Sequence, residues 1–216
     1  MYLLELAGTD DAFAAYEATS AASDVTVIGG GLATADEYAE RADQLALTHR
    51  ISDLLGTTRP ALAAASSRLE ETTFDRTGSV AVRARDVRRA TNVSTQVVER
   101  QLGSILVEAG FTVDLEEPDH ELRAVFAGPP SVETHDAVDI APPADEGVCA
   151  LGWTVLEPAR EFTDRAPTDR PFFQPGSMDP ALARALVNVA GAGRGGRVLD
   201  PMCGTGGLLI EAGLVG

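Results

Sequence analysis

The sequence contains no lysine: all 17 basic residues among its 216 are arginines, against 33 aspartates and glutamates. Two cysteines are too few for a disulfide framework or a cysteine-rich zinc site, and His49, His120 and His135 share no metal-ligand spacing. No apolar run approaches the ~18 residues of a membrane span. The first five residues include an acid and no base, unlike a signal peptide. We therefore expect a cytoplasmic protein without structural disulfides.

The net charge of −16 has two possible explanations. A cation-binding function would need carboxylates clustered at ligand spacing, but the acids are scattered and no EF-hand-like loop occurs. Adaptation to high intracellular salt is the alternative that we favour, because at 1 M salt the Debye length falls to about 3 Å and self-repulsion is screened. In such a halophile-like chain, local charge is a better guide to nucleic-acid binding than net charge.

One segment of the chain is positive. Residues 76–100 hold 6 arginines and 2 acids, whereas residues 1–75 and 101–216 carry net charges of −9 and −11. Arginine is suited to bidentate phosphate contacts, which position RNA without reading its sequence. A solvated charged face is the alternative, but in so acidic a chain we favour RNA contact. The candidate RNA-binding residues are Arg83, Arg85, Arg88 and Arg89.

Local patterns predict a mixed α/β (α+β) fold. Strands are expected at residues 2–7, 25–28, 79–85, 111–115, 121–126 and 147–156, and helices at residues 12–18, 61–71 and 95–109. Val80, Val82 and Ala84 alternate with Ala81, Arg83 and Arg85, as in a strand with one buried face. Pro60 is expected at the first position of its helix, and Ser94 is a good N-cap. The pattern of residues 45–55 leaves their structure open.

Breaks in the pattern suggest where the chain divides. Gly56 to Pro60 is a plausible boundary, because glycine and an X-Pro step both interrupt regular structure. Two proline pairs, 129–130 and 142–143, flank an acidic stretch that we interpret as a loop. Residues 157–170 are charged and contain proline, as expected of a linker.

The sharpest motif begins at Arg197. A short apolar strand, residues 197–199, is expected to end in Asp200, followed by a glycine-rich turn and a helix. This order places a nucleotide-like ligand at the carboxyl end of a parallel strand, where glycines let the backbone approach it closely. The spacing differs from the dinucleotide fingerprint Gly-x-Gly-x-x-Gly, and a phosphate-binding P-loop would need a lysine.

The string Asp-Pro-Met-Cys-Gly-Thr-Gly-Gly over residues 200–207 resembles the cofactor loop of Rossmann-like RNA methyltransferases that use S-adenosylmethionine. Residues 170–188 resemble a segment at the same distance before that loop in archaeal methyltransferases acting on N2 of the guanosine at tRNA position ten. The family usually has Phe and a basic residue in place of Met202 and Gln174. The resemblance implies cofactor contacts for Phe173, Ser177, Asp200, Met202, Cys203, Gly204, Thr205 and Gly206. Phe172 is as plausibly a core residue, and Cys203 a packing residue rather than a nucleophile.

The resemblance to this family is more diffuse over residues 1–156. It implies a ferredoxin-like domain at residues 1–58 and a THUMP RNA-binding domain at 59–156, joined by the linker 157–170 to the incomplete start of a Rossmann-like methyltransferase domain at 171–216. The implied substrate is tRNA, and the implied cofactor is S-adenosylmethionine.

The family's catalytic Asp/Asn-Pro-Pro-aromatic motif does not occur, since neither proline pair follows Asp or Asn. We therefore expect a chain truncated after the cofactor loop, inactive alone and without a catalytic residue. A second chain that supplies the rest of the methyltransferase domain is one candidate partner. The alternative is a non-enzymatic THUMP-type module that delivers tRNA to a separate catalytic chain. A THUMP-containing thiouridine synthase would need a Ser-Gly-Gly-x-Asp-Ser loop, which is absent. A DNA amino-methyltransferase shares the cofactor loop, but the N-terminal half fits tRNA binding better.

Overall fold

The computed structural model describes residues 1–130, 138–141, 146–169, 174, 176–193 and 195–216. Within them, one nine-stranded mixed sheet has the order β6-β5-β7-β9-β4-β1-β3-β2-β8. Its strands are β1 (Tyr2–Leu6), β2 (Thr26–Gly29), β3 (Leu32–Ala35), β4 (Thr48–Thr58), β5 (Ser79–Asp86), β6 (Thr112–Val113), β7 (His120–Ala127), β8 (Asp139–Ile140) and β9 (Val148–Leu156). The helices are α1 (Asp11–Ala18), α2 (Leu62–Glu70), α3 (Thr95–Glu108), α4 (Pro180–Val189) and α5 (Gly207–Val215), with short 3-10 turns η1 (Glu40–Gln44), η2 (Val87–Arg89), η3 (Glu161–Arg165) and η4 (Pro167–Asp169). In the described part of the chain, no helix is both long and apolar enough to cross a bilayer.

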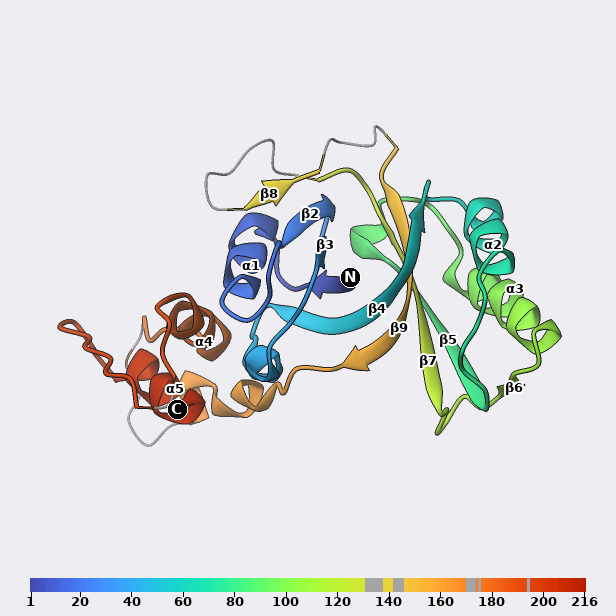
Figure 1. Ribbon diagram of the computed structural model, residues 1–216. Coiled ribbons are helices and arrows are strands. Elements are labelled where there is room, and N and C mark those ends of the chain that lie inside the picture. Colours follow the sequence, from blue (N-terminus) through green and yellow to red (C-terminus); the bar gives the residue numbers. More distant parts are fainter. Residues whose placement is uncertain (131–137, 142–145, 170–173, 175, 194) are drawn as a thin grey trace.

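The N-terminal segment, residues 1–58, packs α1 against β1 and β2 (Figure 1). Asp10 caps α1, its carboxylate accepting a hydrogen bond from the Phe13 amide at 2.9 Å. Leu4 and Leu6 of β1 lie in the core beside α1, whereas Leu3 lies in a second apolar cluster on the opposite face. This alternation is the period of two that a strand imposes on its side chains.

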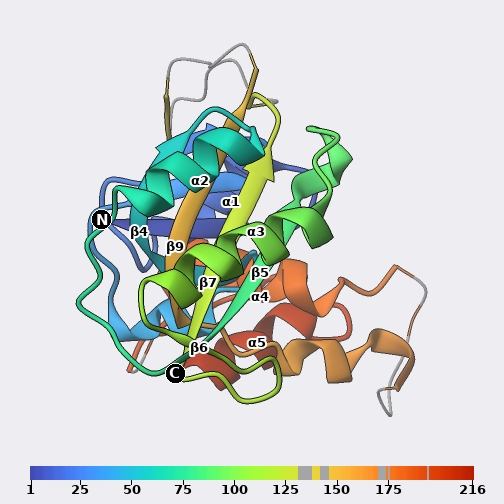
Figure 2. The same ribbon diagram turned by 90° about the vertical axis from the view of Figure 1, so that its right-hand side faces the viewer.

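The next segment, residues 59–156, packs α2 and α3 side by side over β5, β7 and β9 (Figure 2). Val80, Val82 and Ala84 of β5 belong to this core with the apolar stripe of α3, which confirms the predicted alternation. The arginines of β5 consequently lie on the other face of the sheet. The expected mixed α/β class is confirmed.

Strands β4 and β9 join these two segments of the chain. β4 pairs antiparallel with β1 and with β9, and it runs through Gly56 to Thr58 before the chain turns toward α2. β4 passes from one core to the other, so neither of its faces is buried along its whole length. For this reason the pattern of residues 45–55 did not predict a secondary structure. The cores on either side have separate members, one around α1 and one around α3.

Several local predictions need correction. α2 begins at Leu62 with Ala61 as its N-cap, so Pro60 lies before the helix rather than at its first position. Ser94 is the N-cap of α3, but its side chain makes no capping hydrogen bond. Ala109, expected as the last residue of its helix, is the exposed C-cap residue after α3. Strands β3 and β8 were not predicted. β8 lies inside the segment interpreted as a loop, and it pairs with β2.

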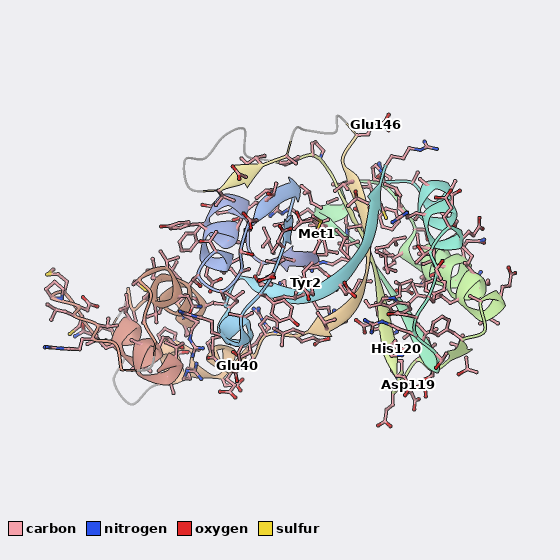
Figure 3. All side chains as sticks on the ribbon, in the orientation of Figure 1. Met1, Tyr2, Glu40, Asp119, His120 and Glu146 are labelled. Carbon is pink, nitrogen blue, oxygen red and sulfur yellow. The ribbon has the colours of Figure 1, made fainter. Side chains whose placement is uncertain are left out.

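The described part of the expected linker is packed rather than free. Phe162 of η3 is 2% exposed and forms a small core with Ala46 and Ala185, which brings α4 against the first half of the chain. α4 and α5 lie beside each other below α1 (Figure 1). Glu40 of η1 faces this C-terminal segment (Figure 3), where it lines a hollow with Gly193 and Gly213.

Candidate functional site

The glycine-rich loop is an open turn that leads into α5. Gly204 and Gly206 have φ of +51° and +74°, a left-handed backbone that disfavours other residues, and Gly206 is the N-cap of α5. A side chain at Gly206 would meet no atom within 4 Å, so the space over the loop is open. Asp200 accepts a hydrogen bond from the Met202 amide at 3.0 Å, which tightens the turn. The predicted turn and helix are therefore present.

The strand predicted before this loop is not. Residues 197–200 have no strand geometry, and the side chain of Leu199 is 88% exposed. A strand of a parallel sheet needs neighbours on both sides, and no strand of the nine-stranded sheet pairs with this segment in the described residues. The prediction of a strand here was wrong, because the apolar composition favours a strand but pairing with a neighbour is a tertiary property.

Two predicted cofactor residues that are far apart in sequence meet at the loop. The Ser177 hydroxyl lies 3.1 Å from that of Thr205 and donates to the Gln174 carbonyl oxygen at 2.7 Å. The segment before α4 thus borders the loop. Phe173 lies outside the described residues. Met202 and Cys203 are exposed on the turn.

This arrangement fits the amino-acid end of S-adenosylmethionine. The first amides of a helix have no partner within the helix and carry its positive dipole, so the N-terminus of α5 suits the carboxylate of that ligand. Glycine backbone allows close approach. The Ser177 proton is donated to Gln174, so Thr205 donates to Ser177, and the Thr205 oxygen can still accept a hydrogen bond from a ligand. Cys149 lies elsewhere, and burial raises the pKa of its thiol to about 12, so it is no nucleophile.

The four predicted RNA-binding arginines divide into two kinds. Arg83 donates to the Leu115 carbonyl at 2.6 Å, and Arg85 lies 3.2 Å from the buried carboxylate of Glu5. Arg88 grips Asp11 with both terminal nitrogens, at 3.0 and 2.6 Å, and this hydrogen bonding raises its pKa. These three guanidinium groups therefore serve the protein's own structure in part.

Arg89 differs, because its exposed side chain makes no hydrogen bond or ion pair with any described residue. It lines a hollow at the N-terminus of α3 together with Asn92 and Ser94. Arg88, Arg89 and Asn92 have φ between +54° and +56°, which is rare for residues other than glycine. Such conformations persist where the surroundings enforce them and cluster at functional sites. The hollow joins the Arg89 guanidinium, which has no partner among the described residues, to helix amides that the Ser94 side chain leaves uncapped, and this arrangement suits a phosphate.

A buried ionic cluster on the same sheet face was not predicted. Arg123 of β7 grips Glu5 of β1 through two hydrogen bonds, at 2.6 and 2.9 Å, and both residues are buried. An acid within an otherwise apolar first strand was the only sequence signal. It could not be paired with Arg123, which is 118 residues away.

Comparison with known proteins bears on both halves. Residues 167–216 match a family described as "RMKL-like, methyltransferase domain". The chain is 37% identical over 175 residues to a tRNA (guanine(10)-N2)-dimethyltransferase of Methanothermobacter thermautotrophicus, covering 80% of this chain and 46% of that protein. It is 36% identical over 121 residues to the protein of that name in Methanocaldococcus jannaschii, covering 55% and 29%. The predicted resemblance to this family is confirmed.

Among solved structures, TrmN from Thermus thermophilus superposes with a TM-score of 0.56 at 24% identity, covering all of this chain and 62% of that one. This likeness supports the fold. The chain spans less than half the length of the curated relatives reported above.

Proposed function

We propose that this chain is the tRNA-binding part and the first cofactor-binding segment of an S-adenosylmethionine-dependent tRNA guanine-N2 methyltransferase acting at position ten. The observation that carries the proposal is similarity to proteins of that name over 80% of the chain. The contact between Ser177 and Thr205 supports it, because it places Ser177, in the segment that resembles the family's, beside the glycine-rich loop.

The proposed domains are a ferredoxin-like unit at residues 1–58, a THUMP unit at 59–156, a linker at 157–170 and the start of the methyltransferase domain at 171–216. Two separate cores, around α1 and around α3, support the first division. The family match that begins at residue 167 supports the last.

The residues of this chain would hold the methyl donor and the tRNA. The α5 amides and the loop from Asp200 to Gly206 would bind the amino-acid end of S-adenosylmethionine, which supplies the methyl group. Arg89 and the N-terminus of α3 would bind a tRNA phosphate, and Arg83, Arg85 and Arg88 would add positive charge beside it. Because the relatives extend far beyond the matched part, we expect methyl transfer to need residues from the rest of their length, on this chain or on a second one.

The tRNA half is tested with Arg89→Glu. We expect weaker binding of unmodified tRNA in a filter-binding titration, with the slope of log K against log salt reduced by about one. The matched control is Arg59→Glu, which makes the same charge change at an exposed arginine after β4 and should leave affinity and slope unchanged. Equal effects of the two variants would show a general charge effect and overturn the proposed phosphate site.

The cofactor half is tested by calorimetric titration of S-adenosylmethionine into the chain. We expect binding by the unaltered protein and its loss in Gly206→Val, because valine strains a backbone with φ of +74°. Gly103→Val is the control: Gly103 lies in α3 with open space around it and an ordinary helical φ. Binding of tRNA without any binding of S-adenosylmethionine would favour the alternative, a non-enzymatic module that delivers tRNA to another chain.

A further inference from the structure

A network of buried polar side chains extends from α1 to α5. It begins at Glu17 of α1, whose side chain is fully buried. One carboxylate oxygen accepts from the Ala46 amide and the Asn188 side chain, each at 2.7 Å, and the other accepts from the Leu47 amide at 2.7 Å. A single carboxylate therefore joins α1, the segment after η1, and α4.

The network continues along α4. The Asn188 amide group also donates to the Gln44 carbonyl oxygen at 3.0 Å, and Arg184, one turn earlier, donates to the Gln44 side chain at 2.8 Å. Two further nitrogens of Arg184 donate hydrogen bonds to one oxygen of Glu211 in α5, at 3.0 and 2.8 Å. Arg165 of η3 grips the same carboxylate with two hydrogen bonds of 3.0 Å.

Glu211 is the main attachment of α5. It is fully buried, and Gly207 is the only other buried residue of this helix. The large apolar side chains Leu209, Ile210 and Leu214 are 37%, 40% and 53% exposed. Apolar packing alone would therefore hold α5 weakly, and the directed hydrogen bonds of Glu211 set where the helix lies.

The electrostatics agree with this role. Burial by itself would raise the pKa of Glu211, but the hydrogen bonds and charges of Arg165 and Arg184 lower it, so the carboxylate stays ionised. At Glu17, burial raises the pKa, and the three donors offset it only in part. Buried ionic groups are poor sources of net stability, but they penalise any arrangement that leaves them unpaired. Such a network selects one placement of α5.

We propose that Glu211, Arg184 and Glu17 are positioning residues that fix the cofactor loop at the start of α5 relative to the N-terminal unit. Glu211 lies five positions beyond Gly206, the last residue of the open turn, so a shift of α5 shifts the amides that the cofactor would contact. The inference rests on the proposed function for its consequence in cofactor binding. The network itself does not.

Hydrogen–deuterium exchange of the full chain tests the network without any ligand. We expect Arg184→Met and Glu211→Gln each to speed exchange of the amides of residues 207–215 by ~10-fold or more, while β5 and β7 keep their protection. Arg59→Met is the matched control, since it removes an exposed arginine outside the network. Unchanged exchange in α5 in both variants would overturn the proposal. Should Arg184→Met unfold the chain, Glu211→Gln decides alone, because it alters only the α5 side.

Affinity for S-adenosylmethionine tests the positioning role. We expect its Kd to rise ~10-fold or more in Glu211→Gln and in the distant Glu17→Gln, with the Kd for tRNA within twofold, because a misplaced loop loses oriented contacts. Arg184→Met should also raise the Kd for S-adenosylmethionine. Arg184→Lys, which keeps the charge, should raise it less. Faster α5 exchange with an unchanged Kd would make the network merely structural and overturn the role. If the unaltered chain binds no S-adenosylmethionine, the proposed function fails instead, and the exchange result still decides the network.

Discussion

Burying the carboxylate of Glu5 costs free energy, and pairing with arginines offsets that cost. Its carboxylate is 1% exposed, and burial by itself would raise its pKa. The hydrogen bonds and charge of Arg123, with the charges of Arg85 and Arg50, outweigh that and lower the pKa below its ordinary value. The carboxylate is therefore ionised at neutral pH and dependent on its arginines.

We predict that Arg123→Met lowers the free energy of unfolding at pH 7 by about 3–5 kcal/mol, because it leaves a buried charge with its main partner gone. Urea denaturation followed by circular dichroism measures the loss. Arg59→Met, at an exposed arginine, should change the free energy by less than about 0.5 kcal/mol.

The same pair gives a pH dependence. Since the folded pKa of Glu5 is lowered, its contribution is present above about pH 4.3, where an unfolded glutamate titrates, and is lost as the pH falls through the folded value. The difference between the unaltered chain and Arg123→Met should therefore shrink in acid. A difference that stays constant as the pH falls from about 4.3 through the folded pKa would show that the loss comes from packing.

The position of the arginine cluster was predictable from the sequence. The net charge of that segment is positive, and all four predicted residues lie on β5 or the turn after it. Their partners could not be predicted, because Glu5 and Asp11 are about 80 residues away in sequence. Contact with RNA remains a prediction for each of the four, and Arg89 is the cleanest one to test.

At the scale of elements, two helix starts look alike in sequence and differ in structure. Asp179 caps α4 by accepting from the Ala181 and Leu182 amides at 2.9 and 3.1 Å. Ser94 stands at the same position of α3 without a side-chain hydrogen bond. Both are preferred N-cap residues, so sequence alone ranks them together.

We predict that Asp179→Ala lowers the free energy of unfolding by about 1 kcal/mol, because it leaves helix amides without a partner. Ser94→Ala should cost much less, since no bond is lost. Thermal unfolding of the two variants compares them directly. A larger loss for Ser94→Ala would mean that its hydroxyl caps α3 in solution and would weaken the proposed phosphate hollow.

Elements with one buried face were predictable, and others were not. β5 places Val80, Val82 and Ala84 on the face that α3 covers, as predicted. β4 crosses between two cores and kept no single pattern. Residues 197–199 have strand-forming composition but no partner strand among the described residues, so composition predicted an element that pairing did not supply.

For the whole molecule, charge is the dominant property. A net charge of −16 repels itself in dilute buffer, and we propose that the chain is adapted to high salt. We predict that its Tm rises between 0.1 and 1 M KCl, because the Debye length falls from about 10 Å to about 3 Å. Calorimetry in the two buffers measures the shift. A Tm that falls with salt would show that surface ion pairs outweigh the repulsion and would contradict the adaptation.

The sequence by itself determined the mixed α/β class, most of the strands and helices, the glycine-rich turn and the family resemblance. These depend on short-range patterns: a period of two, a capping residue, or eight consecutive loop positions. Only the tertiary structure decided that β4 joins two cores, that Arg88 is held by Asp11, and that Glu17 and Glu211 tie α5 to the N-terminal unit. Those contacts join residues up to 171 positions apart, and local sequence carries no record of which distant group will satisfy a buried charge.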